Sequence, residues 1–201
     1  MTVLSLVVKG GWVMIFIGLC SIIGAWVYIE RLLMYRRVDV DAGRLMGAIR
    51  PLIEAGRLEE AERQLARIDA GPASVLRAGL GAWSRGREAV RDALEAAGNQ
   101  EVFRLEERTS MLATVAGIAP LLGFLGTVTG MIKAFQQIEN LGGNVNATVL
   151  AGGIWEAMIT TAAGLMVGIP ALAAYNHLNN RIHRMSAQME QSGGELMSMM
   201  A

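Results

Sequence analysis

The sequence is poor in charge for its length of 201 residues. Asp, Glu, Lys and Arg together make up 18% of it, whereas a soluble domain usually carries about 25%. The shortage is local, because some windows hold no charge while others are densely charged, and the mean hydropathy is +0.38. This patchiness indicates an integral membrane protein with a soluble insert. The formal net charge is zero, so nothing in the total points to nucleic acid.

Cysteine and histidine are nearly absent. Cys20 is the single cysteine, which excludes a disulfide framework or a thiolate metal site within one chain. His177 and His183 are six residues apart and share no helix face, so we expect no metal site. We find no Ser-His-Asp or Cys-His constellation, and "GFLGTVTG" follows no predicted strand, so we expect no catalytic residues.

The first long apolar run predicts a retained membrane helix. Residues 10–29, "GGWVMIFIGLCSIIGAWVYI", contain no charge and would cross about 30 Å as a helix, which is the thickness of a hydrocarbon core. A cleaved signal peptide is the alternative. It is disfavoured because the run is too long and is followed by Arg31, Arg36 and Arg37 rather than by a cleavage site.

Two further apolar windows predict a helical hairpin in the membrane. Residues 109–132 hold no Lys, Arg, Asp or Glu, and a third span is expected near 149–175, where Glu156 is the one formal charge. Gly142 and Gly143, with nearby asparagines, predict a short turn between them. Residues 31–108 contain fourteen arginines. The positive-inside rule therefore predicts an outer N-terminus and a cytoplasmic C-terminus.

The arginine-rich part is predicted to be helical. Apolar residues recur at three-to-four spacing around 41–69, with Pro51 and Gly56 as breaks, which indicates a lone helical hairpin. A helix from Arg87 could run with few breaks into the second span, with a kink or break expected at Gly98-Asn99.

The predicted fold is therefore all-α and polytopic, with three transmembrane helices and long helices extending into a cytoplasmic helical region. The predicted segments are the first transmembrane helix (1–35), the cytoplasmic helical region (36–108), the second transmembrane helix (109–138), a short periplasmic turn (139–148), the third transmembrane helix (149–176) and a cytoplasmic C-terminal helix or tail (177–201).

Small residues and prolines mark the last two spans. A GxxxG pattern occurs in each span and favours close helix packing in lipid, although glycines are also tolerated generally in membrane helices. A proline in each span frees a backbone carbonyl and predicts a kink. The residues assigned to packing or kinks are Gly126, Gly130, Gly164, Gly168, Pro120 and Pro170.

Polar side chains in these spans are candidates for an ion path. On a helix, Glu156 and Thr160 lie about 40° apart, whereas Thr161 lies about 140° from Glu156. Thr127 is expected at a comparable depth in the second span. An ionisable group within a span costs roughly 2.5–3.5 kcal/mol and faces protein or a wet cavity. The structural alternatives are hydroxyls bonded to their own helix, and a Glu156 paired with Lys133.

Three segments resemble the MotA/TolQ/ExbB family of ion-channel subunits, most closely its ExbB and TolQ branch. They are "KGGWVMIFIGLCSIIGAWVYIERL" (9–32), "APLLGFLGTVTGMIKAF" (119–135) and "GGIWEAMITTAAGLMVGIPALAAYN" (152–176). The resemblance implies a homopentamer in the bacterial inner membrane, whose pore holds two single-span helices of an ExbD- or TolR-like partner. It also implies that the partner's aspartate carries protons, and that the work reaches the outer membrane through a TonB- or TolA-like tether.

Carried over by position, the resemblance implies that Thr127 and Thr161 line the ion path, that Glu156 marks the same polar zone, and that Pro170 marks the inner end of the third span. Thr160 departs from the ExbB/TolQ pattern, where alanine is common. It would add a hard oxygen ligand, so H⁺ is favoured and Na⁺ stays open, with no cofactor expected. The alternatives are a sodium-driven stator-like unit and a non-conducting membrane scaffold for a single-span partner.

Overall fold

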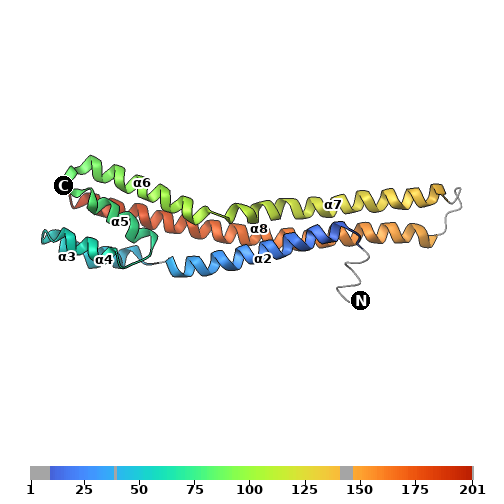
Figure 1. Ribbon diagram of the computed structural model, residues 1–201, viewed down its shortest axis with the longest axis horizontal. Coiled ribbons are helices and arrows are strands. Elements are labelled where there is room, and N and C mark those ends of the chain that lie inside the picture. The colour runs from blue at the N-terminus through green and yellow to red at the C-terminus, as the bar shows by residue number, and fades with distance from the viewer. Residues whose placement is uncertain (1–9, 39, 141–146, 201) are drawn as a thin grey trace. The chain divides into compact units, whose positions relative to one another are not determined.

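A computed structural model of the chain describes residues 10–38, 40–140 and 147–200, and within these ranges every regular element is a helix. The elements shown in Figure 1 are α2 (Val13–Val38), α3 (Ala42–Glu54), α4 (Leu58–Leu65), α5 (Gly71–Gly81), the 3₁₀ helix η1 (Trp83–Arg85), α6 (Arg87–Glu106), α7 (Thr109–Asn140) and α8 (Ala147–Ser198). The all-α prediction is confirmed.

The chain forms two compact units. The first unit comprises Met1–Ile29 and Arg108–Asn176, and the second comprises Glu30–Glu107 and His177–Ala201. Helices α2 and α8 each contribute to both units, because the boundaries at Ile29 and Asn176 fall within them.

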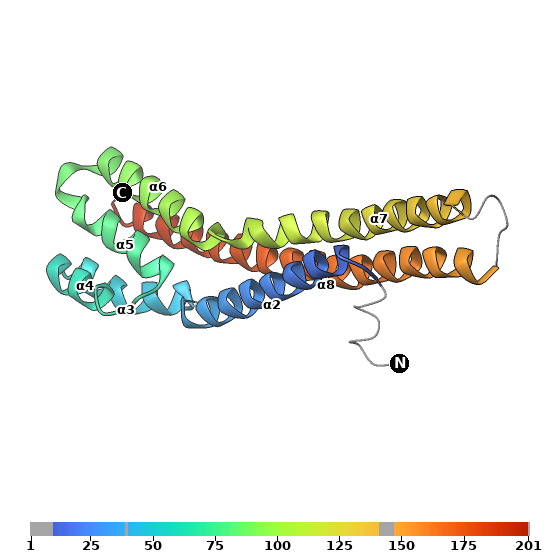
Figure 2. The ribbon, with the colours of Figure 1, turned by 45° about the vertical axis from the view of Figure 1, so that its right-hand side comes forward.

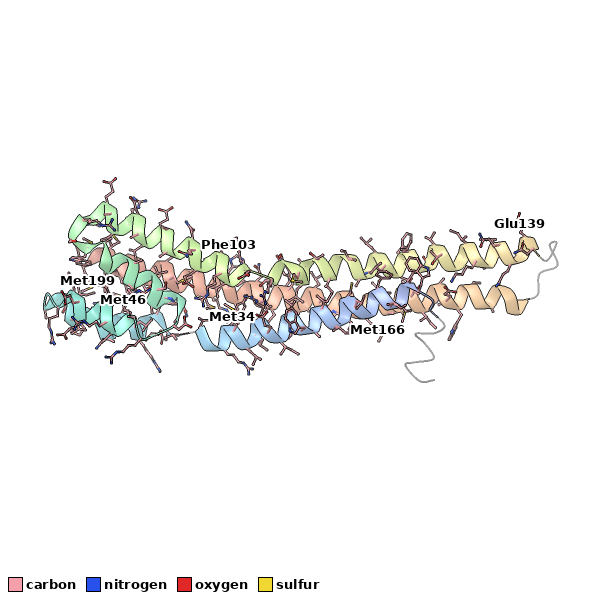
Figure 3. All side chains as sticks on the ribbon, viewed as in Figure 1. Met34, Met46, Phe103, Glu139, Met166 and Met199 are labelled. Atoms are coloured by element: carbon pink, nitrogen blue, oxygen red, sulfur yellow. The ribbon has the colours of Figure 1, made fainter. Side chains whose placement is uncertain are left out.

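The first unit contains the apolar helices. Three helices are long and apolar enough to cross a membrane, over Val13–Arg36, Thr109–Asn140 and within Ala151–Ser198, which confirms the three predicted spans. Large apolar side chains point outward from all three, including Ile22 (69% exposed), Leu121 (67%) and Met166 (75%). Figure 3 shows Met166 on α8 in this outward orientation. Outward apolar side chains suit a hydrocarbon surrounding rather than water.

Helix α7 and the first half of α8 lie side by side in both views (Figures 1 and 2). The first span packs on α7, since a Cβ on Gly24 would lie 3.4 Å from Val115 and 3.9 Å from Leu112. The predicted turn at 139–148 falls largely outside the described residues. Its two ends are helical, because α7 extends to Asn140 and α8 begins at Ala147.

The second unit is a helical bundle with its own apolar core. Helices α3 and α4 form the predicted hairpin, and α5 packs on α6. Gly79 on α5 allows this close approach, because a Cβ there would lie 2.8 Å from Leu94 of α6 and from Leu196 of α8. The largest fully buried core side chains include Tyr35, Met46, Ile49, Leu65, Leu76, Leu178, Ile182 and Leu196.

Two predicted helix breaks are wrong. Pro51 lies inside α3, where burial of Leu45, Ile49 and Ile53 on one face offsets the ladder hydrogen bond that the proline removes. No break occurs at Gly98-Asn99, because α6 continues through both residues to Glu106. The chain instead leaves the helix at Glu107, and Arg108 adopts a left-handed backbone with φ of 63°.

Side chains of α2 donate hydrogen bonds to the last carbonyls of α6, which have no helical N–H partners. The Tyr35 hydroxyl donates to the Leu105 carbonyl over 2.7 Å, and Arg31 Nη1 donates to the Arg104 carbonyl over 3.5 Å. Tyr35 is fully buried and Arg31 is 4% exposed. Because the last carbonyls of a helix need partners outside it, these contacts stabilise the end of α6 at this point.

Candidate functional site: the seam between α7 and α8

Glycines bring the backbones of α7 and α8 together. A Cβ on Gly123 would lie 2.8 Å from the Thr160 carbonyl oxygen, and one on Gly130 would lie 3.0 Å from the Gly153 carbonyl oxygen. From the other side, a Cβ on Gly164 would lie 3.0 Å from the Gly123 Cα. No side chain larger than hydrogen fits at these positions, so the two helices meet backbone to backbone.

Of the two prolines in these spans, one belongs to the seam. A Cβ on Gly168 would lie 2.7 Å from Cδ of Pro120, so the proline ring of α7 rests on the glycine of α8. Pro170 lies inside α8 and its side chain is exposed. Among the predicted packing residues, Gly126, Gly130, Gly164, Gly168 and Pro120 therefore lie in the seam, and Pro170 lies outside it.

Thr160 is enclosed by the seam. Its side chain is 0% exposed and lies where a Cβ on Gly126 would otherwise be, with Thr160 Cγ2 2.8 Å from that point. Its hydroxyl is within 2.9 Å of the Ala157 carbonyl and 3.1 Å of the Glu156 carbonyl, both on its own helix. The hydroxyl of Thr160 is therefore occupied by its own backbone in the single chain.

Thr161 lies one residue further and reaches the other helix. Its hydroxyl is 3.3 Å from the Gly123 carbonyl of α7 and 3.3 Å from the Ala157 carbonyl of α8. The side chain is half-buried. The Thr161 hydroxyl therefore makes a hydrogen-bond contact across the seam.

Thr127 lies on α7 with its side chain half-buried, and its hydroxyl donates to the Phe124 carbonyl over 2.6 Å. Thr129, which the sequence analysis did not single out, donates to the Gly126 carbonyl over 3.2 Å. Both bonds run within α7. The structure thus brings Thr160 and Thr161 to the seam with Gly123 and Gly126, while the Thr127 hydroxyl bonds within α7.

Glu156 is paired with Lys133. The Lys133 Nζ to Glu156 Oε1 distance is 2.5 Å, with the carboxylate side chain 18% exposed and the lysine side chain 47% exposed. The sequence analysis left this pair open as an alternative to a carboxylate at the mouth of a cation path, and the structure contains the pair. A paired carboxylate attracts a passing cation less than a free one, because the ammonium cancels most of its field.

Gly11 covers this ion pair from the first span. Its backbone has φ of 69°, and a Cβ there would lie 2.6 Å from Glu156 Oε1 and 3.5 Å from Lys133 Nζ. Glycine is therefore required at position 11 for two reasons: the backbone is left-handed, and a side chain there would collide with the ion pair. The close contacts of Gly11 and Gly153 could not be predicted from the sequence, because a glycine in an apolar run does not reveal which neighbour approaches it.

No group of three or more His, Cys, Asp or Glu side chains suited to a metal ion occurs among the residues that the model describes. What the seam offers is a row of backbone carbonyls, threonine hydroxyls and one charge pair within otherwise apolar helices.

Comparison with known proteins decides the family. Residues 67–191 match the model of the MotA/TolQ/ExbB proton channel family. The chain belongs to this family. It is 36% identical over 178 residues to an ExbB-like biopolymer transport protein of Synechocystis sp., an alignment covering 85% of this chain and 68% of the relative. It is also 30% identical over 182 residues to a biopolymer transport protein ExbB homolog of Methanothermobacter thermautotrophicus, covering 90% of this chain and 64% of the relative.

The TolQ side of the family matches a shorter stretch. The chain is 44% identical over 93 residues to the Tol-Pal system protein TolQ of Haemophilus influenzae, which covers 45% of this chain and 40% of that protein. The matched part is therefore about two thirds or less of each of these relatives' lengths. The family and the three apolar helices together make this a membrane protein of a channel family rather than of an enzyme family.

Proposed function

We propose that the chain is the ion-conducting subunit of an ExbB/TolQ-like motor in the bacterial inner membrane. In this proposal five copies surround a pore that holds two single-span helices of an ExbD- or TolR-like partner. Ion flow down the proton motive force drives work that a TonB- or TolA-like tether carries towards the outer membrane. Membership of the family and the names of the relatives support the proposal.

Thr161 carries the proposal. Its half-buried hydroxyl, in contact with the Gly123 carbonyl of the neighbouring span, offers a polar group that a bound partner carboxyl could meet at the seam. A hydroxyl both donates and accepts hydrogen bonds, so it can stabilise a carboxyl in either protonation state. Thr127 is proposed to line the same path.

Burial of Thr160 favours protons over sodium. A sodium site needs several oxygen ligands turned towards the ion, whereas the Thr160 hydroxyl is enclosed and bonded to its own helix. We therefore propose that Thr160 fills the seam and that H⁺ is the coupling ion.

The test is proton flux through the complex with its single-span partner, reconstituted in liposomes under an imposed pH gradient. Thr161→Ala is expected to lower flux per assembled complex at least about tenfold, the loss associated with one hydrogen bond to a charged group. Thr114→Ala is the matched control, because Thr114 also bonds to a carbonyl of its own helix, Ser110, but has no contact across the seam. Full flux in an intact Thr161→Ala assembly would refute the role of Thr161.

A non-conducting scaffold gives a different result in the same experiment. If the chain only anchors its partner, wild-type complexes conduct no more than empty liposomes, and Thr161→Ala changes partner retention alone. Repeating the wild-type measurement with sodium in place of the pH gradient separates the two ions, since sodium-dependent flux would contradict the assignment of Thr160 to packing.

A further inference from the structure

A polar cleft of about 280 Å³ lies in the second unit, where the connection between α4 and α5 meets α5 and α6. Polar side chains dominate its lining, and three of them are arginines. The polar lining residues are Arg67, Asp69, Ser74, Arg77, Glu101 and Arg104. Neither the seam between α7 and α8 nor the proposed ion path uses any of these residues.

Arg104 is already occupied by the two carboxylates. Its Nη1 lies 3.7 Å from Glu101 Oε2 and 4.0 Å from Asp69 Oδ1. Glu101 is 9% exposed, and the pair with Arg104 offsets part of the cost of burying its charge. The lining carries three arginines and two carboxylates, so the cleft keeps a net positive charge, and two of its arginines lie outside these pairs.

Arg67 and Arg77 are the two arginines outside these pairs. Both side chains are exposed and both line the cleft, yet in the described part of the chain neither has an ion pair. A guanidinium presents five N–H donors in a planar fork that matches the oxygens of a phosphate. Two such groups from different elements, one following α4 and one on α5, face a single cleft.

The cleft also lies beside an uncapped helix end. Helix α5 begins at Gly71, and its N-cap residue Ala70, which lines the cleft, provides no side-chain cap. Ser74 adds a half-exposed hydroxyl to the lining. This hydroxyl is a further donor beside the arginines, and the positive end of the helix dipole favours an anion nearby.

We propose that this cleft binds a phosphate group, held by Arg67 and Arg77 with Ser74 as a further donor. The group belongs to a phospholipid headgroup or to a small soluble phosphate compound, since both present the same oxygens. Glu101 and Asp69 oppose it, so the site is a moderate one whose affinity these carboxylates limit. The proposal is independent of ion conduction.

The first test is calorimetric titration of the purified full chain in detergent with inorganic phosphate. Arg67→Gln and Arg77→Gln are each expected to weaken binding about tenfold, as for loss of one charge-assisted contact. Arg85→Gln is the control, because Arg85 is exposed on η1 and lies outside the cleft. The proposal is overturned if the wild type binds neither phosphate here nor lipid in the mass spectrometry below, or if Arg85→Gln causes an equal loss.

Removing a negative charge from the cleft distinguishes a phosphate site from surface arginines that only contact solvent. Asp69 is 90% exposed on its side chain, so Asp69→Asn leaves the fold intact and removes one opposing charge. Phosphate is expected to bind several-fold tighter to this variant, because the variant lacks the repulsion between Asp69 and phosphate. The size of the effect is that of an exposed charge interaction. Unchanged or weaker binding would contradict the assignment of the cleft.

The source of the phosphate is decided by native mass spectrometry of the chain with added phosphatidylglycerol. Bound lipid that is lost in the Arg67→Gln/Arg77→Gln double variant and displaced by inorganic phosphate identifies a headgroup site. Binding of inorganic phosphate without lipid retention identifies a soluble ligand. Lipid retained equally by the double variant, together with unchanged binding of inorganic phosphate by it, rejects both.

Discussion

Thr160 of α8 occupies the space that Gly126 of α7 leaves open. Thr160 Cγ2 would lie 2.8 Å from a Cβ at Gly126, and the threonine is completely buried. Enclosed in this way, the hydroxyl of Thr160 bonds to the Glu156 and Ala157 carbonyls of its own helix. The two residues therefore act as one packing unit.

Gly126→Ala is expected to destabilise the chain by about 1–3 kcal/mol, the usual cost of overpacking, and to lower the thermal unfolding midpoint in detergent. Gly117→Ala on the same helix is the control, because a Cβ there meets nothing within 4 Å. Alanine in place of a helical glycine should stabilise by roughly 0.5–1 kcal/mol there. Equal midpoints for the two variants would show that the seam is not close-packed at Gly126.

Removing one partner of the Lys133–Glu156 pair is expected to cost more than removing both. Lys133→Met leaves a carboxylate that is 18% exposed without its partner, whereas Lys133→Met/Glu156→Gln leaves no charge. Because the lysine is half-exposed, the coupling should be about 1 kcal/mol or less. A double-mutant cycle on unfolding measures it, and strictly additive losses would refute the pairing.

Gly11→Ala should destabilise the first unit more than Gly56→Ala destabilises the second. Both glycines have positive φ, 69° and 73°, but a Cβ at Gly56 meets nothing while one at Gly11 meets Glu156. The shared backbone cost is roughly 1–2 kcal/mol, and the clash adds to it only at Gly11. Chemical denaturation of the two variants compares these costs, and a larger loss at Gly56 would contradict the close approach at Gly11.

Tyr35→Phe is expected to lower stability by about 1–3 kcal/mol, because it leaves the buried Leu105 carbonyl without its hydroxyl donor. Hydrogen exchange at the end of α6 should rise together with this loss. Tyr175→Phe is the comparison, since Tyr175 is half-buried and its hydroxyl has no hydrogen bond within the described part of the chain. If both variants exchange alike, the Tyr35 contact does not stabilise the end of α6.

The predicted breaks at Pro51 and Gly98-Asn99 show where local signals mislead. Glycine and proline carry an intrinsic helix penalty, but tertiary packing overrides it in α3 and α6. The actual break, at Glu107 and Arg108, carries no glycine or proline. It coincides with contacts from Arg31 and Tyr35, which lie about seventy residues earlier. A local sequence pattern cannot predict contacts with residues so far away in the chain.

The sequence by itself determined the three spans and the family. Hydrophobic length is a one-dimensional property set by the thickness of a bilayer, and the hallmark segments can be read in order along the chain. Only the tertiary structure decided which polar groups are available. Thr160 and Thr161 are neighbours in sequence, yet one is enclosed against Gly126 and the other contacts the Gly123 carbonyl. Their roles differ because the 100° step of a helix turns them towards different parts of α7.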